Sequence, residues 1–287
     1  MEYYKTLPVL KERIWGGSRL AEYNRPTMGL QIGESWEYCA EHSALPFLIK
    51  YLDANDILSI QVHPDDEHAW LLEKENNGKS EMWVILDCKE DSYIIYGFKK
   101  KVARKEVEEA IADNNIMDLL NIVKVKKGDC IYLPAGTIHT LGSGIIAYEI
   151  QQPSDLTYRL YDWDRTDKTG KKRKLHIEKA LEVIDYSGRL PGIINIHDIH
   201  SRKSINHIEI SNDSFRTKYH FIDGGMSYII QKNHACIISL IEGSAYIISR
   251  NGKEEIRKGD TLVITGDSNN NMYIQGISNI EFIETSH

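Results

Sequence analysis

One histidine stands out because of the residues around it. His139 lies in the stretch "KGDCIYLPAGTIHTLG" (Lys127 to Gly142), which fits the pattern GxxxxxPxGxxH. Glycine and proline at these positions predict a hairpin whose return strand aims one imidazole into a small barrel. Such an imidazole is either a metal ligand or a hydrogen-bonded core histidine. A metal needs three or four donors, contributed by several strands.

A second set of donors lies in "ILSIQVHPDDEHAW". Residues two apart on a strand point to the same face, so Gln61 and His63 enter the same space, with Ser59 in line behind them. Pro64 then ends the strand. The acidic residues 65–67 predict the first turn of a helix, where the helix dipole favours carboxylates, rather than metal ligands.

A third candidate donor lies in "NGKSEMWVILDC", where Lys79 and Glu81 share a face and lead into an apolar strand. A glutamate at the start of a strand is commonly just exposed to solvent. Taken by itself, Glu81 is therefore compatible with either a surface position or a place beside the two histidines.

The elements that must position these residues are mostly strands. Short apolar and β-branched runs bounded by Gly, Asn and Asp recur along the chain, among them "PFLIKYLDA", "EMWVILDC", "GIIAYEIQQ" and "ACIISLIEGSAYIISRNG". They predict a mainly antiparallel β protein. Helical periodicity is local, and we expect short helices in "DDEHAWLLEKEN", "KKKVARKEVEEAIADNNIMDLLN" and "HIEKALEVID".

The chain changes character around residues 165–192, where a Lys/Arg-rich run precedes the last helical segment. We therefore expect a catalytic domain over 1–165, a helical connector over 166–204 and a β domain over 205–287. "VKVKKGDCIYLPAGTIHTLGSG" is echoed by "EEIRKGDTLVITGDSNNNMYIQG". Aligning Gly128 with Gly259 puts Asn270 opposite His139, so the second domain is predicted to have no metal site.

Composition excludes several kinds of partner. With 287 residues, 41% of them hydrophobic, and a net charge of -7, the chain is an ordinary globular protein that suits neither nucleic acid nor an anionic membrane. Four widely spaced cysteines and an N-terminus without an apolar signal segment predict a cytoplasmic protein. A small-molecule substrate is the expected partner. The sequence does not give the oligomeric state.

The combined motifs resemble the type I mannose-6-phosphate isomerases of the cupin superfamily, in their short bacterial form. The resemblance covers nearly the whole chain. It rests on "WGG", "GESWE", "LSIQVHPDD", "GKSEMWVIL", "LPAGTIHTLG", "EIQQPSDLTYRLYDWDR" and "LHIEKALEVID". It implies a mainly β fold of two cupin-like β-barrel (jelly-roll) units with a few short helices. It also implies zinc-dependent interconversion of mannose 6-phosphate and fructose 6-phosphate.

The resemblance further implies roles for individual residues. His63, Glu81 and His139 match the metal ligands of the family, and Gln61 matches a further ligand found in some members. Arg159 in "TYRLYDW" matches the residue usually assigned as catalytic. One Zn²⁺ per chain is the expected cofactor, because a mixed oxygen and nitrogen ligand set suits zinc.

The general base is left open by the sequence. A bound metal would stabilise an enediolate while a base moves a proton between C1 and C2. Arg159 stays protonated, so we expect it to bind negative charge instead. The candidate bases are Glu149, which matches a pocket carboxylate of the family, Lys79, whose pKa burial or the metal could lower, and a metal-bound water.

The phosphate of the substrate requires cations. Lys79, Arg159 and Arg165 are the candidates, with Ser59 as a hydroxyl donor. Larger family members have a lysine in place of Arg165. Glu34 in "GESWE" matches a pocket-side residue but is equally compatible with a surface acid at a strand edge. The run "KKRK" from Lys171 is interpreted as a solvated connector.

Two other functions compete with isomerisation. One is a different cupin metalloenzyme, such as a dioxygenase or decarboxylase, which would require a redox-active metal and more histidine ligands. The other is a sugar-binding cupin without activity, in which ligands or the arginine are usually lost. All of the matching residues are present in this chain, which favours the isomerase.

Overall fold

The computed structural model describes residues 2–39, 45–167, 169–198, 205–211, 214–231, 233–266 and 270–287. For 205–211 it gives the course of the backbone. Four antiparallel sheets and three α-helices make up the described chain. None of the helices in these ranges has the length and apolar character needed to cross a membrane.

The first half of the chain forms two sheets that face each other. The seven-stranded sheet contains, in order, β13 (Ile194–Asn195), β9 (Asp129–Leu133), β6 (Glu81–Cys88), β11 (Ile145–Gln151), β4 (Leu48–Ala54), β3 (Ile32–Cys39) and β2 (Val9–Gly17). The five-stranded sheet contains β12 (Tyr158–Tyr161), β5 (Ile60–Val62), β10 (His139–Leu141), β7 (Tyr93–Phe98) and β8 (Leu120–Lys124).

The second half repeats this plan. Its six-stranded sheet contains, in order, β1 (Tyr3–Lys5), β20 (Thr261–Thr265), β17 (Ala235–Glu242), β22 (Ile280–Ser286), β15 (Arg216–Ile222) and β14 (Ile205–Ser211). Its four-stranded sheet contains β16 (Ser227–Ile230), β21 (Met272–Gly276), β18 (Ser244–Ser249) and β19 (Gly252–Arg257). The expected mainly β, cupin-like fold with a few short helices is confirmed.

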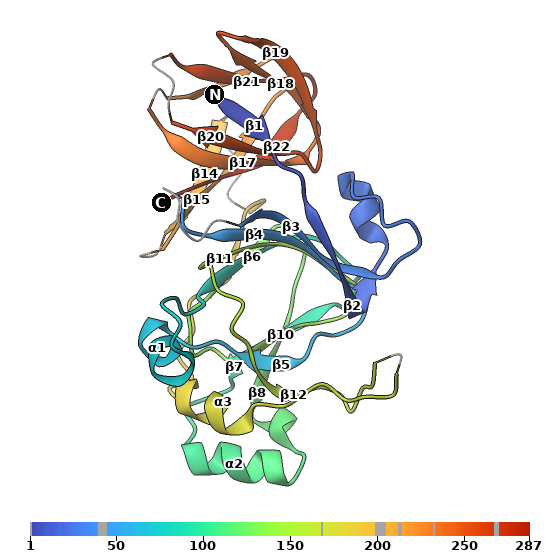
Figure 1. Cartoon of the computed structure of the whole chain (residues 1–287), viewed down its shortest axis with the longest axis vertical. Coiled ribbons are helices and arrows are strands. Elements are labelled where there is room, and N and C mark those ends of the chain that lie inside the picture. Colours follow the sequence, from blue (N-terminus) through green and yellow to red (C-terminus); the bar gives the residue numbers. More distant parts are fainter. Residues whose placement is uncertain are drawn as a thin grey trace.

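The sheets stack along the long axis of the molecule, as Figure 1 shows. One apolar cluster fills the space between the two sheets of each half, and another joins the seven-stranded sheet to the six-stranded sheet. A fourth cluster packs the five-stranded sheet against α2 (Arg104–Ala112) and α3 (Ile177–Val183). Each of the two large sheets is therefore buried on both faces, which explains their nearly continuous apolar strands.

β11 illustrates how one strand serves two cores. Ile146, Tyr148 and Ile150 pack into the cluster between the halves, whereas Ile145 and Ala147 face the interior of the first half. The alternation places Glu149, which follows this inner set, on the interior side as well. A strand that appears uniformly apolar in sequence therefore directs one carboxylate into the first sandwich.

The three α-helices lie within the segments in which the sequence predicts them, although α2 begins at Arg104, inside its segment. α1 (Asp66–Glu73) starts after Asp65, whose side chain accepts a hydrogen bond from the backbone nitrogen of His68 at 2.8 Å. The acidic residues after Pro64 are thus an N-terminal cap and first turn, as expected. Two short 3₁₀ helices complete the described elements, η1 (Arg19–Tyr23) and η2 (Ile116–Asp118).

The strand pairing differs from the expected linear division of the chain. β1, at the N-terminus, pairs with β20 in the second half, and β13, inside the expected connector, pairs with β9 in the first. Gly128 and Gly259 do occupy equivalent turns, with φ of +88° and +92°. However, β10 begins at His139 while β21 begins at Met272, so strand position matches His139 with a buried methionine rather than with the exposed Asn270.

The turn before β20 holds the two halves together. Arg25 forms a buried ion pair with Glu37 and also donates a hydrogen bond to the carbonyl oxygen of Gly259. A Cβ atom at Gly259 would lie 2.1 Å from the carbonyl oxygen of Tyr23. Backbone from the second half thus contacts backbone from the first without room for a side chain.

We expect Gly259→Ala to destabilise the protein more than Gly225→Ala. Both glycines have positive φ, but a Cβ at Gly225 would meet no atom within 4 Å. The control should cost about 1–2 kcal/mol for the left-handed backbone alone. Gly259→Ala should lose about 1–3 kcal/mol more from overpacking. Equal thermal unfolding temperatures for the two variants would contradict this role for the turn.

Candidate active site

The three predicted donors meet inside the first sandwich. His63 directly follows β5, Glu81 begins β6 and His139 begins β10, and all three side chains are buried. The His139 Nε2 atom lies 3.2 Å from Glu81 Oε1, and His63 Nε2 lies 3.6 Å from Glu81 Oε2. Their donor atoms all lie within 4.8 Å of one another. The sequence motifs thus identify side chains that the fold brings together.

Backbone carbonyl groups orient both imidazoles. His63 Nδ1 lies 2.7 Å from the carbonyl oxygen of Leu156, and His139 Nδ1 lies 2.8 Å from that of Thr137. Each Nδ1 therefore carries the proton, which leaves an unprotonated Nε2 lone pair on the side of each ring that faces Glu81. Burial, reinforced by the nearby Lys79 charge, holds the pKa of His63 well below its usual value. A neutral imidazole of this kind is ready to bind a metal.

The cluster has unsatisfied polar atoms of the kind that a cation would satisfy. His63 Nε2 and both carboxylate oxygens of Glu81 are buried without a hydrogen bond of suitable geometry, although Lys79 Nζ lies 2.9 Å from Glu81 Oε2. Burial alone would raise the pKa of Glu81, but the Lys79 charge and the two neighbouring histidines together lower it and keep the group ionised. Two imidazoles and a carboxylate fit Zn²⁺.

Gln61 lies beside this cluster. It pairs with His139 across β5 and β10, and its Nε2 lies 3.3 Å from His139 Nε2. Its Oε1 accepts a hydrogen bond of 3.2 Å from the hydroxyl of Ser59. The expected alignment of Ser59, Gln61 and His63 on one strand is therefore present, and Gln61 is within reach as a further donor.

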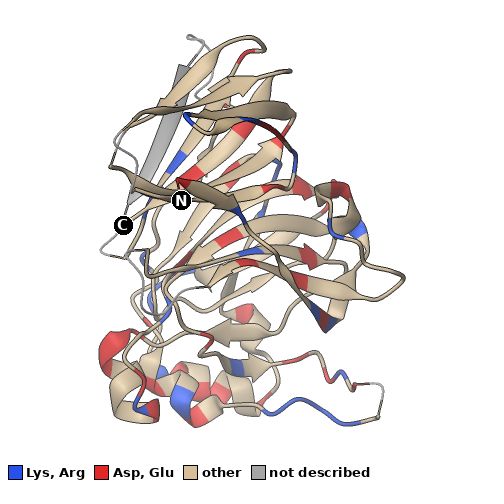
Figure 2. Ribbon diagram, turned by 45° about the horizontal axis from the view of Figure 1, so that its top comes forward, with Lys and Arg blue, Asp and Glu red and all other residues tan. Residues whose placement is uncertain are grey.

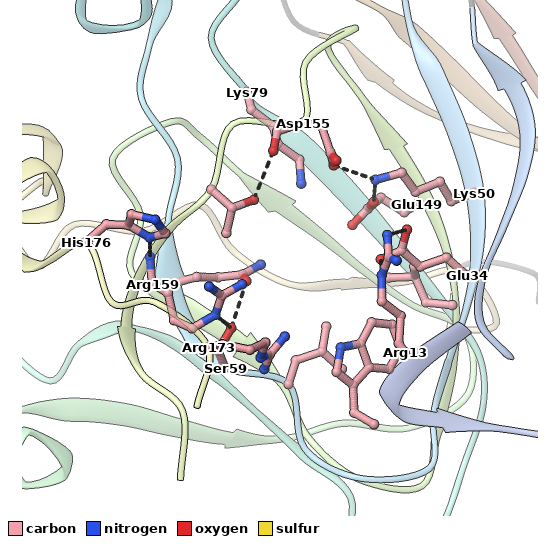
Figure 3. A pocket seen from close by; sticks show the side chains of 15 residues that line it. Arg13, Glu34, Lys50, Ser59, Lys79, Glu149, Asp155, Arg159, Arg173 and His176 are labelled. Atoms are coloured by element: carbon pink, nitrogen blue, oxygen red, sulfur yellow. Dashed lines mark hydrogen bonds and ion pairs between the residues drawn. The ribbon is translucent and has the colours of Figure 1, made fainter. Parts of the chain in front are cut away.

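A cavity of about 420 Å³ opens next to the cluster (Figure 3). Its wall includes Ser59 and Gln61 on one side and β4 and β11 residues on another. The charged side chains that line it are Arg13, Lys50, Lys79, Arg159, Arg173, Glu34, Glu149 and Asp155. Five cations against three carboxylates make this an attractive pocket for a small anion.

Glu149 lies on the pocket wall, held from two sides. Lys50 Nζ lies 3.3 Å from its Oε1, and the indole nitrogen of Trp83 donates to its Oε2 at 2.8 Å. Burial, followed by repulsion from Glu81, raises the pKa of Glu149 above its usual value despite these partners. A fixed carboxylate with a raised pKa has the properties of a general base.

The environment of Lys79 does not favour its expected role as a general base. Burial alone would lower the pKa of its ammonium group, but the adjacent Glu81 and Glu149 carboxylates outweigh burial and raise it. The expected depression of the pKa by burial is therefore not observed in this arrangement. Lys79 is therefore protonated in this arrangement, which suits it to binding negative charge.

Arg159 lies at the opposite side of the pocket from Glu149 and Glu34, as Figure 3 shows. Its Nε donates to the Ser59 hydroxyl at 3.2 Å, and one terminal nitrogen donates to the carbonyl oxygen of Lys174 at 3.0 Å. Burial, and then repulsion from Arg173, lower its pKa. Two neighbouring guanidinium groups make this side the most cationic part of the wall.

Arg165 does not line the pocket, which corrects the expectation of a direct substrate contact. Its guanidinium donates to Asp162 at 2.7 Å and pairs with Asp56 at 3.3 Å. Arg173 lines the pocket instead and shares the Asp162 carboxylate. Arg173 lies on the long loop between β12 and α3, where Figure 2 shows acidic and basic residues interspersed. The expectation of a purely solvated connector is therefore wrong at this residue.

Glu34 is neither exposed nor unpartnered. Arg13 donates to both of its oxygens, at 2.8 and 3.0 Å, and Trp36 donates at 2.7 Å. Although burial favours the neutral acid, Lys50 and Arg13 lower the pKa of Glu34 to about 2. Of the two interpretations of the sequence, a pocket-side residue or a surface acid at a strand edge, the structure therefore supports the first.

Several lining residues escaped the sequence analysis. Lys50 carries a signal that could have identified it, because a charged residue inside the apolar run "PFLIKYLDA" must be buried with a partner. Arg13, Asp155 and His176 lie in segments without any comparable signal. They reach the pocket only through the tertiary fold.

Comparisons with known proteins identify relatives of this chain. A family model described as "Phosphomannose isomerase type I, catalytic domain" matches residues 27–83. The curated mannose-6-phosphate isomerase ManA of Bacillus subtilis is 36% identical over 293 residues, covering 90% of this chain and 91% of its own. The mannose-6-phosphate isomerase of Streptococcus mutans is 33% identical and covers 89% of this chain and 90% of its own.

Solved structures give the same result. A mannose 6-phosphate isomerase crystal structure from Bacillus subtilis superposes with a TM-score of 0.90 at 30% identity, with both chains fully covered. A structure titled as zinc-bound mannose 6-phosphate isomerase has the same fold, with a TM-score of 0.76 at 16% identity and full coverage of both chains. The chain belongs to the type I phosphomannose isomerase family.

Proposed function

We propose that the protein interconverts mannose 6-phosphate and fructose 6-phosphate through an enediolate, with a bound metal ion. The observation that carries this proposal is a pocket next to a buried His/Glu/His cluster, in which a carboxylate with a raised pKa lies across from two arginines. Relatives named mannose-6-phosphate isomerase support the choice of substrate over the other cupin functions. Such an enzyme would work in the cytoplasm.

One zinc ion per chain at this centre is the proposed cofactor. His63 and His139 would hold it through Nε2 and Glu81 through its carboxylate, with Gln61 as a further ligand. A bound zinc ion supplies a Lewis acid that stabilises negative charge on the C1 and C2 oxygens. The orphaned ligand atoms and a related structure titled as zinc-bound support this assignment.

The phosphate is proposed to lie between Arg159 and Arg173, with the Ser59 hydroxyl as a further donor. These arginines crowd together on one side of the cavity, and a dianion would relieve their mutual repulsion. The sugar would then extend toward Lys79 and Glu149. All lining side chains of this pocket come from residues 13–176, so the first half carries the chemistry.

Proton transfer is assigned to Glu149. As a carboxylate it takes the proton from one carbon, and as the acid it returns that proton to the neighbouring carbon. Lys50 and Trp83 hold it in place, while the Lys79 ammonium stabilises the developing negative charge. Arg159 remains a guanidinium throughout and binds substrate oxygens.

Removing one imidazole should remove the metal and the activity together. His139→Ala eliminates one of three or four ligands, so we expect metal content and turnover to fall in parallel. His68→Ala is the matched control, since this half-exposed imidazole on α1 pairs with Asp65 and not with the cluster. Elemental analysis and a coupled assay give the two readouts. Active wild-type protein with less than about one-tenth equivalent of any transition metal would contradict the proposal.

Arg159→Lys should retain the metal and lose activity. Lysine keeps the charge but loses the planar fork, so kcat/KM should fall by the equivalent of about 2–4 kcal/mol, the range for one preorganised donor. Arg165→Lys, outside the pocket, serves as the control and should stay near wild type. Near-wild-type kcat/KM in both Arg159→Lys and Arg159→Ala would remove Arg159 from the mechanism.

Glu149→Gln should lower kcat by about 10²–10⁴-fold, the usual contribution of a general base. Because the pKa of Glu149 is raised, wild-type activity should fall with decreasing pH at values above the ordinary glutamate pKa. Glu34→Gln should keep that acid limb, since Glu34 with a pKa of about 2 stays ionised there. A kcat/KM profile with the same acid limb in Glu149→Gln would exclude Glu149 as the base.

A further inference from the structure

A second group of metal-type ligands lies inside the second half. His234, Cys236 and Glu284 each offer one donor atom, and the three atoms lie within 4.8 Å of one another. Cys236 and Glu284 are buried, while His234 is half-buried, with 36% of its side chain exposed. The proposed active site uses none of these residues.

The strand register relates this group to the active site. In the first half Glu149 on β11 lies opposite Lys50 on β4 and Trp83 on β6. In the second half Glu284 on β22 lies opposite Lys218 on β15 and Ile238 on β17. Each glutamate is the fifth residue of its strand. Glu284 is therefore the positional counterpart of Glu149.

The same register extends to the other two residues. Glu81 precedes Trp83 by two residues, and Cys236 precedes Ile238 by two, so a cysteine occupies the position of the carboxylate ligand. His234 then corresponds to Lys79. The repeat has kept the glutamate at one of these three positions and carries different metal-binding residue types at the other two. An alignment centred on His139 misses this correspondence, because His139 lies on β10, in the other sheet.

Glu284 is held in a defined orientation. Its Oε1 lies 3.0 Å from His234 Nε2, and its Oε2 accepts from Tyr228 at 2.6 Å and lies 3.2 Å from His220 Nε2. Burial would favour the neutral acid, but these partners keep its pKa well below the usual value. An ionised carboxylate with Oε1 turned toward His234 resembles a metal ligand supported by its neighbours.

We propose that His234, Cys236 and Glu284 bind a second zinc ion. Nitrogen, sulfur and carboxylate oxygen are the ligands that zinc prefers, and three protein ligands leave one position for water. The half-exposed His234 provides access from solvent. The ion would link β17 to β22 in the interior of the second sandwich, apart from the proposed active site. This proposal replaces the expectation that 205–287 lack a metal site.

Cobalt distinguishes the two sites because only the second contains sulfur. Co²⁺ bound to a thiolate gives a near-ultraviolet charge-transfer band, whereas the His63, Glu81 and His139 set has no thiolate to produce one. We expect metal-free full-length protein titrated with Co²⁺ to develop this band. Zinc-loaded protein should contain about twice as much zinc as Cys236→Ala, which keeps the first site intact.

Other cysteine variants locate the band. Cys39→Ala removes an exposed thiol and Cys130→Ala a buried thiol of the first half, and both should retain the band. Cys236→Ala should lose it while turnover stays within a few-fold of wild type. His234→Ala, at a half-exposed position, should weaken Co²⁺ binding even if Cys236→Ala folds poorly. No band in wild type at saturating Co²⁺, or a band lost only in Cys39→Ala, would overturn the proposal.

Discussion

A fully buried carboxylate, Glu81, sets the constraint on which the rest of the structure depends. A buried anion is costly unless cations or hydrogen-bond donors compensate it. Here Lys79 lies 2.9 Å away, and the Nε2 atoms of His63 and His139 point toward the same oxygens. Because Glu81 begins β6 in one sheet, while His63 follows β5 and His139 begins β10 in the other, the two sheets of the first half must meet closely at this end. A divalent cation would satisfy the atoms that the protein leaves without hydrogen bonds.

The second half secures this arrangement from outside. Its six-stranded sheet buries the outer face of the seven-stranded sheet, and the Tyr148 hydroxyl lies 2.7 Å from the Ser239 hydroxyl across the contact. β11 therefore has a rigid apolar face behind it while it presents Glu149 to the pocket. Duplication of the sandwich thus provides a wall for the active half. The counterpart position in the second half, Glu284, is free to serve a different purpose.

The sequence predicts local features well and long-range ones less well. His63, Glu81 and His139 lie in motifs whose residue types and spacing specify strand ends, and the left-handed turns at Gly128 and Gly259 follow from glycine itself. Pairing of β1 with β20 joins segments more than 250 residues apart, and no local pattern encodes it. Arg173 could not be identified from the sequence for a similar reason. A basic run is ordinarily exposed to solvent, and only the tertiary fold places Arg173 at the pocket. Arg165 is the opposite case. The sequence suggests that it binds substrate, but in the fold it donates a hydrogen bond to Asp162 and does not line the pocket.

Anomalous X-ray diffraction at the zinc absorption edge, on crystals of active protein, would show whether a metal ion occupies the His63, Glu81 and His139 centre. We expect a peak bonded to His63 Nε2, the Glu81 carboxylate and His139 Nε2, at about 2.0–2.2 Å from each. It should lie at the floor of the cavity lined by Glu149 and Arg159. Active crystals without a transition-metal peak at these three residues would contradict the account.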